Sequence, residues 1–461
     1  DSHGAASRAI VAITADGQVR VLDDGSHFYA HLSLSPDGNH LAWISWEHPH
    51  MPWDAAETRL AQVHDGTLVN RRTLIGGPGE STQSPTWIDA TTVAVVCEKS
   101  GWWNPWLVDL QGHARPLVTQ EAEWGHTLAD GRLLATRGGP AKRTLVTLDP
   151  ATGHVEDLDV PLDYIESVST DGTTAVVVGE GITQTGAVVS VEVATSTSLA
   201  IATAPLPVAS QWLPTITTIT IPSRDGRIVH AIVHEPTNPN YVSPTCAPTI
   251  VTAHGGPTGH STATAALGYA FFTSRGWRIV DVNYGGSTGY GREYRESLLG
   301  QWGIVDTQDL LAVAEHYKDE RLTPIGGMAV RGGSAGGFAV LNGLVHSTLF
   351  DVGIDYYGVA DLVPLAQDTH DFESRYLDSL IGPYPEQQDL YVQRPPLTHA
   401  ANISSPLLIL QGAADPIVPP SQSLAFRDAC IANGVVHEYH EFAGESHGFR
   451  RADTLTECAQ T

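Results

Sequence analysis

Positive charge is scarce in this sequence. Of its 461 residues, 25 are Lys or Arg and 51 are Asp or Glu, which gives a formal net charge of −26 at pH 7. Only three residues are lysines, namely Lys99, Lys142 and Lys318. Because so acidic a chain repels phosphate groups, we expect no nucleic-acid partner.

Cysteine is also scarce, and long apolar runs are absent. None of the four cysteines forms a Cys-x-x-Cys pair, so we expect ordinary reduced thiols and no metal or cofactor, while a disulfide between Cys430 and Cys458 stays open. No apolar run reaches the ~18 residues of a membrane-spanning helix. Residues 1–4 lack the basic-then-apolar pattern of a secretion signal. These features predict a cytoplasmic protein without a membrane partner, or one whose leader has been removed.

The chain is long enough for two domains, since single cores stop growing near ~250–300 residues. Short alternating strands fill the first half, whereas strands and helices alternate in the second half. The stretch from Pro205 to Pro214 reads as a linker between the two patterns. We therefore predict domains at residues 1–212 and 213–461.

The first half predicts a propeller-like all-β domain. Tight Asp-Gly hairpin turns occur at residues 16–17, 37–38 and 171–172, between short apolar strands. Related units return about every 40–50 residues, the period of a four-stranded propeller blade. We count about four blades, so either the propeller is unusually small or the chain lacks N-terminal blades, and we favour the second explanation. An exposed sheet edge of this kind favours association of the chain with itself.

One loop of the first half is rich in tryptophan and acidic residues. It runs from Trp46 to Asp54 and contains Glu47 and Trp53. The tryptophans either pack between blades or line a substrate pocket. In the second case Glu47 and Asp54 would contact a substrate amine.

The second half carries the pattern of a nucleophile elbow. An apolar run leads into Gly332-x-Ser334-x-Gly336, and a helix-compatible run follows. Such a turn needs neighbours without side chains, and it lifts the serine hydroxyl clear of the sheet. The N–H of Ala335 would then point at a developing oxyanion from a helix N-terminus.

Two later loops complete a catalytic constellation. Asp415 follows a buried apolar strand, and His447 lies in a loop after the next strand. The chain order Ser334, Asp415, His447 is typical of an α/β-hydrolase triad. An earlier strand ends at residues 254–257, where the N–H of Gly255 or Gly256 would supply the second oxyanion donor. The sequence therefore predicts a doubly wound, mostly parallel α/β-hydrolase sheet after the propeller-like domain.

These motifs together resemble the prolyl oligopeptidase family, closest to its acylaminoacyl-peptidase and dipeptidyl-aminopeptidase-like branch. The resemblance implies a serine peptidase with the triad Ser334, Asp415 and His447, whose propeller limits substrates to short peptides or aminoacyl amides. His254 stands where some relatives place a tyrosine, and this favours the acylaminoacyl-peptidase-like arrangement. The chain departs from the family in its short propeller and early C-terminus. The motifs of the second half are His254-Gly255-Gly256-Pro257, residues 283–291, 333–337, 412–419 and 445–449.

Three further residues are candidates for substrate anchoring. They are Tyr284, in the glycine-rich loop, and the cations Arg292 and Arg375. Each cation could equally be an ordinary salt-bridged side chain.

Several functions remain open at this level. The peptidase could require a free or a blocked amino terminus, and the same triad could serve an esterase or an amidase acting on an aminoacyl-nucleoside antibiotic. An alternative outside the enzymes is that the chain is a catalytically silent propeller–hydrolase scaffold used for binding.

Overall fold

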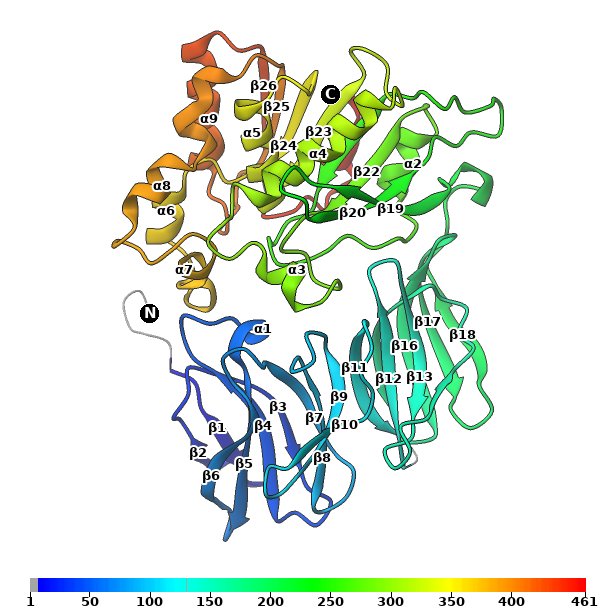
Figure 1. The fold of residues 1–461 in the computed structure, drawn as a ribbon, viewed down its shortest axis with the longest axis vertical. Coiled ribbons are helices and arrows are strands. Elements are labelled where there is room, and N and C mark those ends of the chain that lie inside the picture. Colours follow the sequence, from blue (N-terminus) through cyan, green and yellow to red (C-terminus); the bar gives the residue numbers. More distant parts are fainter. Residues whose placement is uncertain (1–6, 130) are drawn as a thin grey trace. The chain divides into compact units, whose positions relative to one another are not determined.

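The computed structural model describes residues 7–129 and 131–461, so residues 1–4, in which the sequence shows no secretion signal, lie outside the described part. It divides into two compact units, each described by itself (Figure 1). Unit 1 comprises Asp1–Ala204, Gly289–Glu293 and His370–Ser379, and unit 2 comprises Pro205–Thr288, Tyr294–Thr369 and Leu380–Thr461. In the described part, no helix is long and apolar enough to cross a membrane.

The predicted linker region belongs with unit 2. Leu213 is buried in an apolar cluster with Ala265 and Ala270, and Leu206 packs against the same cluster. This packing explains why the second unit begins at Pro205, ahead of the predicted boundary at residue 213.

Unit 1 is built from short antiparallel strands, as the alternating pattern predicts. A pair, β1 (Ile10–Ile13) and β2 (Val19–Asp23), precedes groups of four strands. The last two groups are joined by one parallel contact between β13 and β15. The groups are β3 (Phe28–Leu34), β4 (His40–Trp46), β5 (Glu57–His64) and β6 (Thr67–Gly76); β7 (Thr82–Trp87), β8 (Thr92–Cys97), β9 (Asn104–Asp109) and β10 (Ala114–Pro116); β11 (Glu123–Ala129), β12 (Arg132–Gly139), β13 (Lys142–Leu148) and β14 (Val155–Asp157); β15 (Tyr164–Thr170), β16 (Thr174–Gly181), β17 (Gln184–Glu192) and β18 (Thr197–Thr203).

The core of unit 1 lies between successive strand groups. Strand β8 shows the principle, because successive side chains of a strand point to opposite faces of its sheet. Val93 and Val95 pack into a cluster with the preceding group, and Ala94 and Val96 pack into a cluster with the following group. A strand buried on both faces reads as a continuous apolar run, and this is the propeller-like arrangement that the repeats predict.

Two segments from the second half of the sequence belong to unit 1. The 3₁₀ turn Asp371–Glu373 places the ring of Phe372 5.5 Å from that of Phe28, and Asp371 pairs with Arg8 at 2.7 Å. The N–H of Arg292 donates to the carbonyl of Gly101 at 2.8 Å.

Unit 2 is a mostly parallel sheet between helices, and it confirms the predicted α/β class. The strand order is β19-β20-β22-β21-β23-β24-β25-β26, with β19 and β20 antiparallel and the others parallel. The order reverses between β21 and β23, and open α/β sheets bind ligands at such a switch point. The strands are β19 (Ile216–Pro222), β20 (Ile228–His234), β21 (Thr249–Ala253), β22 (Arg278–Asn283), β23 (Met328–Gly333), β24 (Val352–Tyr356), β25 (Leu407–Gly412) and β26 (His437–Phe442).

Helices flank this sheet, and α4 and α5 lie in front of it in Figure 1. Every residue of α5 before its last is buried, which explains its small and apolar sequence. Unit 2 contains α2 (Leu267–Thr273), α4 (Val305–Asp319), α5 (Ala335–His346), α6 (Leu362–Gln367), α8 (Gln388–Gln393), α9 (Pro420–Asn433) and α10 (Ala452–Gln460), with 3₁₀ turns at Ser210–Trp212 and Pro396–Asn402. Helix α1 (Pro52–Ala55) and the 3₁₀ turn Asp371–Glu373 belong to unit 1, and the division between the units falls within α3 (Arg292–Glu296) and α7 (Tyr376–Leu380).

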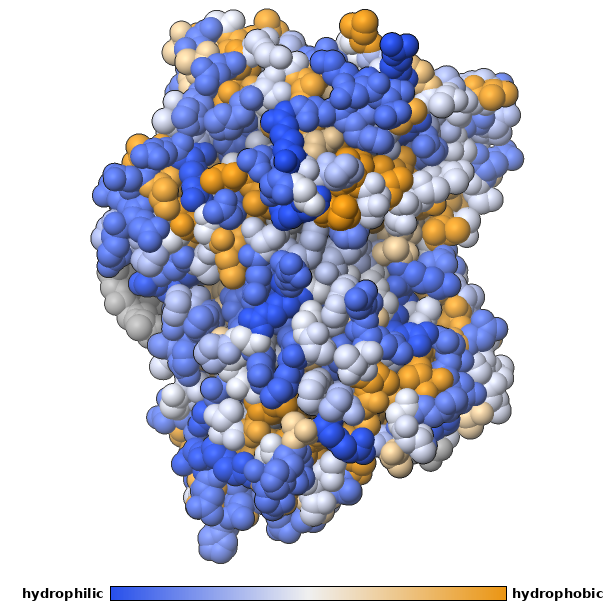
Figure 2. Space-filling view, viewed as in Figure 1, coloured by the Kyte–Doolittle hydropathy of each residue, from blue (hydrophilic) through white to orange (hydrophobic). Residues whose placement is uncertain are grey.

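The surface is largely polar. On the face drawn in Figure 2, hydrophilic residues cover most of each unit, and apolar residues form small separate groups.

Candidate active site

Ser334 lies on a sharp turn between β23 and α5. Its backbone angles are φ 57° and ψ −122°, a conformation that residues other than glycine rarely adopt. Its N–H donates to the carbonyl of Tyr356 at 3.0 Å, and its carbonyl accepts from the N–H of Phe338 at 3.0 Å. Such strain costs on the order of 1–3 kcal/mol and persists only where surrounding structure holds it, as these hydrogen bonds do.

The two glycines of the elbow are required by close backbone contacts. A Cβ on Gly336 would lie 2.2 Å from the carbonyl oxygen of Ala253, and one on Gly332 would lie 2.5 Å from the carbonyl oxygen of Gly336. No side chain fits at these distances, so the Gly-x-Ser-x-Gly spacing is a steric consequence of the turn.

Asp415 and His447 meet beyond the ends of β25 and β26. Asp415 Oδ2 and His447 Nδ1 are 2.7 Å apart, with no exposed surface on the Asp415 side chain and 22% exposure on that of His447. Asp415 Oδ1 accepts from the N–H groups of Ile417 and Val418 at 2.9 and 3.0 Å. The carboxylate is therefore fixed on both oxygens, and it can hold the imidazole with Nε2 free for proton transfer.

Tyr357 stands between the elbow and the histidine. Its ring lies 4.8 Å from the His447 ring, and a Cβ on Gly333 would lie 3.1 Å from its Cε2 atom. In the described residues, neither Ser334 Oγ nor His447 Nε2 makes a hydrogen bond. Catalytic hydrogen bonds are often long before substrate binds, so this geometry is compatible with a working pair.

The loop after β21 passes directly beside the serine. A Cβ on Gly255 would lie 3.5 Å from the Cβ of Ser334. The N–H of Ala335 begins α5 on the other side of the serine. Gly256, the alternative second donor, has φ 132°. The structure thus places Gly255 and Ala335 beside Ser334, and their role as oxyanion donors stays a prediction.

His254 supports this loop in its neutral form. Its Nε2 lies 2.7 Å from Ser287 Oγ and its Nδ1 lies 2.8 Å from the carbonyl of Gly255. Burial lowers the pKa of His254 to about 4, so at neutral pH the ring carries no charge beside the oxyanion site.

The structure corrects the predicted role of Tyr284. Its side chain is completely buried and stacks on the ring of His254 at 4.3 Å. Its hydroxyl donates to the carbonyls of His254 and Pro257 at 3.0 and 3.3 Å. No surface of Tyr284 remains for a substrate, so we infer that its side chain instead supports the loop at residues 254–257.

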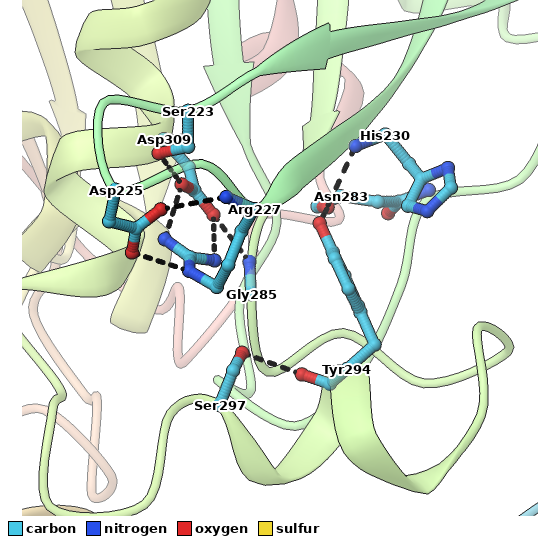
Figure 3. Close-up of polar contacts among 9 residues, drawn as sticks. All are labelled: Ser223, Asp225, Arg227, His230, Asn283, Gly285, Tyr294, Ser297 and Asp309. Atoms are coloured by element: carbon cyan, nitrogen blue, oxygen red, sulfur yellow. Dashed lines mark hydrogen bonds and ion pairs between the residues drawn. The ribbon is translucent and has the colours of Figure 1, made fainter.

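The glycine-rich loop after Tyr284 is anchored by a buried ion pair (Figure 3). Asp309 Oδ2 accepts from the N–H of Gly285 at 2.7 Å, and its Oδ1 lies 2.8 Å from Arg227 Nη2. Ser223 Oγ donates to Asp309, while Asp225 pairs with Arg227 Nε at 2.7 Å. Burial raises the pKa of Asp309, and the Arg227 guanidinium offsets part of this effect.

A second anchor of the same loop is Tyr294. Its hydroxyl donates to the carbonyl of Asn283 at 2.6 Å and accepts from the N–H of His230 at 3.4 Å (Figure 3). The two anchors hold the start of the loop, at Gly285 and Asn283, and neither belongs to the triad.

The acidic and aromatic candidates of the tryptophan-rich loop lie in unit 1. Glu47 Oε2 is 2.6 Å from His27 Nδ1, and Asp54 accepts from the N–H of Met51 at 3.0 Å at the start of α1. The ring of Trp53 lies 5.8 Å from that of Tyr376. Their contact with a substrate stays a prediction.

The two candidate arginines also lie in unit 1. Arg292 begins α3, and Arg375 pairs with Asp378 at 2.5 Å while remaining about half exposed. The triad and oxyanion residues, in contrast, all lie in unit 2.

Sequence reasoning missed the aromatic residues around His447. Tyr357 has φ 40°, which is unusual for an aromatic residue, and its ring meets that of Phe449 at 5.3 Å. The available signal was an aromatic pair, Tyr356 and Tyr357, at the end of an apolar strand beside the elbow strand. Such a pair is common in cores, so its position became informative only with the strand order.

The described residues contain no group of three or more His, Cys, Asp and Glu side chains placed to hold a metal ion. The cysteines are free, including Cys430 and Cys458, so the disulfide left open by the sequence is not formed.

Comparison with known proteins agrees with this architecture. The family model described as "Prolyl oligopeptidase family" matches residues 264–460. Dipeptidyl aminopeptidase BIII of Pseudoxanthomonas mexicana is 29% identical over 261 residues, covering 54% of this chain and 37% of the relative. Acylamino-acid-releasing enzyme 1 of Oryza sativa subsp. japonica is 32% identical over 212 residues, covering 44% and 27%. The chain therefore matches well under two thirds of the length of these curated relatives.

A solved structure gives a more complete match. A puromycin-hydrolyzing peptidase of Mycobacterium tuberculosis is 40% identical, with a TM-score of 0.94, and the match covers 98% of this chain and 72% of that one. Similarity at this level extends over both units, beyond the elbow and triad motifs alone. The chain belongs to the prolyl oligopeptidase family.

Proposed function

We propose that this chain is a serine peptidase that hydrolyses short peptides or aminoacyl amides. The observation that carries the proposal is the buried Asp415–His447 pair at 2.7 Å, in one sheet with a serine on a strained turn before a helix. The proposed roles follow from this placement: Ser334 is the nucleophile, His447 the base and Asp415 its orienting partner.

In the proposed reaction, Ser334 Oγ attacks the scissile carbonyl carbon while His447 Nε2 takes the hydroxyl proton. The negative oxygen of the tetrahedral intermediate accepts from the N–H groups of Ala335 and Gly255. The C–N bond then breaks, and His447 returns the proton to the leaving amine. Water attacks the acyl-enzyme with His447 again as base, which releases the acid and restores the serine.

The direct test is hydrolysis of aminoacyl p-nitroanilides with free and with N-acetylated amino termini, with the Ser334→Ala protein as control. Preference for the free amine establishes an aminopeptidase, and preference for the acetylated form establishes an acylaminoacyl peptidase. If neither substrate is cleaved, labelling of Ser334 by a fluorophosphonate shows that the site is intact and acts on another substrate. A silent scaffold would not be labelled. Absence of both turnover and labelling in folded protein contradicts the peptidase proposal.

A second candidate substrate class is the aminoacyl-nucleoside amide. It is favoured by the 40% identity to a structure titled as a puromycin-hydrolyzing peptidase. Incubation with puromycin, followed by chromatography of the aminonucleoside and the free amino acid, tests this proposal. Release that requires Ser334 supports it, whereas turnover of p-nitroanilides without turnover of puromycin removes this candidate.

We also propose that the protein is cytoplasmic and associates with itself. Free cysteines fit a reducing compartment. Val11 and Ile13 on β1 face Val21 and Val19 on β2, and all four side chains are 41–68% exposed. Such an apolar face favours association. Cell fractionation and sedimentation velocity test the two statements.

A further inference from the structure

A cavity of about 230 Å³ lies in unit 2 behind the elbow, between the sheet and helices α2 and α10. Its described lining includes the backbone of Gly332 and Gly333 but neither Ser334 nor His447, so it is separate from the reacting groups. A cavity of ~150 Å³ is enough to bind benzene. This one therefore has room for an aromatic ring that carries one small polar group.

Arg331 brings a positive charge to this cavity, and Asp281 interacts with it electrostatically without forming an ion pair among the described residues. Its guanidinium lies over the rings of Tyr356 and Phe272, at 4.9 and 5.6 Å from their centroids. Across residues 7–129 and 131–461 it has no hydrogen bond or ion pair, and its Nη1 atom is buried without a partner. A buried charged donor without a partner is unfavourable, so an acceptor from outside the chain would be stabilised here.

The carboxylate that interacts electrostatically with Arg331, that of Asp281, takes its hydrogen bonds from other groups. Asp281 lies on β22, separated from Arg331 by strand β21. Its Oδ1 accepts from Ser261 Oγ and its Oδ2 from the hydroxyl of Tyr269, both at 2.8 Å. Among the described residues that line the cavity, none is acidic.

Two tyrosines add neutral donors. Tyr356 and Tyr357 both line the cavity, and in the described chain their hydroxyls make no hydrogen bond. Burial raises the pKa of Tyr357 to about 12, so its hydroxyl keeps its proton at neutral pH. One cation and two hydroxyl donors around a space without acidic groups match a carboxylate, which accepts through both oxygens.

We propose that this cavity binds a small organic monocarboxylate with an apolar body. The carboxylate accepts from Arg331, Tyr356 and Tyr357, and the apolar body contacts Phe449 and Leu455, which also line the cavity. Binding is coupled to catalysis, since Tyr357 also contacts the ring of His447 at 4.8 Å. An occupant that fixes the Tyr357 ring changes the freedom of the histidine.

The test uses 4-fluorobenzoate as the probe and 4-fluorobenzamide as its neutral counterpart, with binding to the full chain measured by ¹⁹F NMR and calorimetry. We expect saturable one-to-one binding of the acid and much weaker binding of the amide. Arg331→Met weakens binding of the acid by about tenfold or more. The matched control is Arg275→Met: Arg275 also lies over a ring, that of Phe271 at 3.6 Å, but outside the cavity.

Equal binding of acid and amide, or unchanged affinity in folded Arg331→Met protein, overturns the site. Should that variant not fold, the Tyr356→Phe/Tyr357→Phe protein decides, because it keeps both rings: several-fold weaker binding supports the site and unchanged binding overturns it. Protein already labelled at Ser334 by a fluorophosphonate must still bind the probe. Loss of binding there would place the probe at the nucleophile and overturn the proposal.

The coupling has its own readout. Saturating 4-fluorobenzoate should change the rate at which a fluorophosphonate labels Ser334 in the unmodified protein, and not in Arg331→Met. An unchanged rate in the unmodified protein overturns the coupling.

Discussion

The two units handle buried charge differently. Of the Asp, Glu, Lys, Arg and His side chains among its described residues, unit 1 buries only Glu98, Glu123 and His126. Unit 2 buries many more, and most lie on or next to its parallel strands and the helices behind them. They are His234, Arg278, Asp281, Arg295, Asp306, Asp309, Asp355, Asp415 and Glu445. A repeated apolar sheet needs no such groups for stability, whereas unit 2 uses them both to anchor loops, as at Asp309, and in the Asp415–His447 pair.

An Asp–His contact of nearly the same length occurs in each unit, and the two contacts differ in how exposed they are. In unit 1, Asp109 Oδ2 lies 2.8 Å from His113 Nδ1, and the two side chains are 39% and 83% exposed. In unit 2, Asp415 and His447 are 2.7 Å apart but 0% and 22% exposed. Water and salt screen the first pair, whereas the second acts in a less polar environment and can fix an imidazole.

The largest expected effect comes from breaking the second pair. Asp415→Asn keeps the shape of the side chain but removes the charge that orients His447. We expect kcat/KM for a cleaved amide to fall by about 10⁴-fold, with little change in thermal stability. Asp109→Asn is the matched control and should leave kcat/KM unchanged. Equal effects of the two substitutions would show that burial does not distinguish the pairs.

Next in size is the loss of a buried ion pair. In Arg227→Met, Asp309 keeps its burial but loses the guanidinium 2.8 Å away. We expect the free energy of unfolding to fall by about 3–5 kcal/mol, because an uncompensated charge remains. The control in unit 1 is Arg137→Met, whose partner Asp157 is 63% exposed at 2.7 Å. That change should cost less than about 1 kcal/mol. Urea unfolding of both variants checks the contrast, which a similar loss in each would contradict.

The two units should respond alike when the free energy of unfolding is measured against pH, because each unit contains a buried histidine. Burial lowers the pKa of His234 in unit 2 and of His126 in unit 1 to about 4. Between pH 4 and the unfolded value of 6.5 the folded state therefore binds fewer protons, so stability is full above pH 6.5 and is lost as pH falls toward 4. Each histidine contributes on the order of 3 kcal/mol to this loss.

The variants His234→Gln and His126→Gln should each flatten the dependence of unfolding free energy on pH. His64→Gln is the control, since the side chain of His64 is 75% exposed. A pH slope unchanged in the two buried variants would mean that these rings are protonated in the folded protein.

The smallest expected effect concerns the proposed part of unit 1 in binding. Glu47→Gln removes the negative charge that faces His27 at 2.6 Å. If Glu47 contacts a substrate amine, KM for substrates with a free amino terminus should rise about twofold to fivefold, with kcat unchanged. Glu57→Gln, which disturbs the neighbouring pair with Arg59, should leave KM as it is. If KM for the free substrate is the same in Glu47→Gln as in the unmodified protein, and KM for the acetylated substrate is likewise the same in both, Glu47 does not belong to the site.

Much of the architecture could be read from local patterns. The Asp-Gly turns and alternating strands predicted the β array, and β8 shows why: its run of small apolar residues is buried on both faces. The elbow could also be predicted from the sequence, because the backbone around Gly332 and Gly336 leaves no room for a Cβ at either position. Tyr284 was misjudged because a tyrosine in a glycine-rich loop carries no local sign of burial. Segments 289–293 and 370–379 were placed with the second half, since their contacts with unit 1 join residues far apart in sequence.

The sequence by itself determined the class of each unit, the order Ser334, Asp415, His447 and the close turn that raises the serine, because these depend on periodicity and on backbone sterics over a few residues. Only the tertiary structure decided that Asp415 is buried with both oxygens bonded, that Tyr284 supports a loop and that Arg331 forms no ion pair among the described residues. Burial and charge pairing arise from strands adjacent in the sheet but distant in the chain. The order of strands across the sheet therefore decides which of this chain's charges are neutralised and which stay available to a ligand.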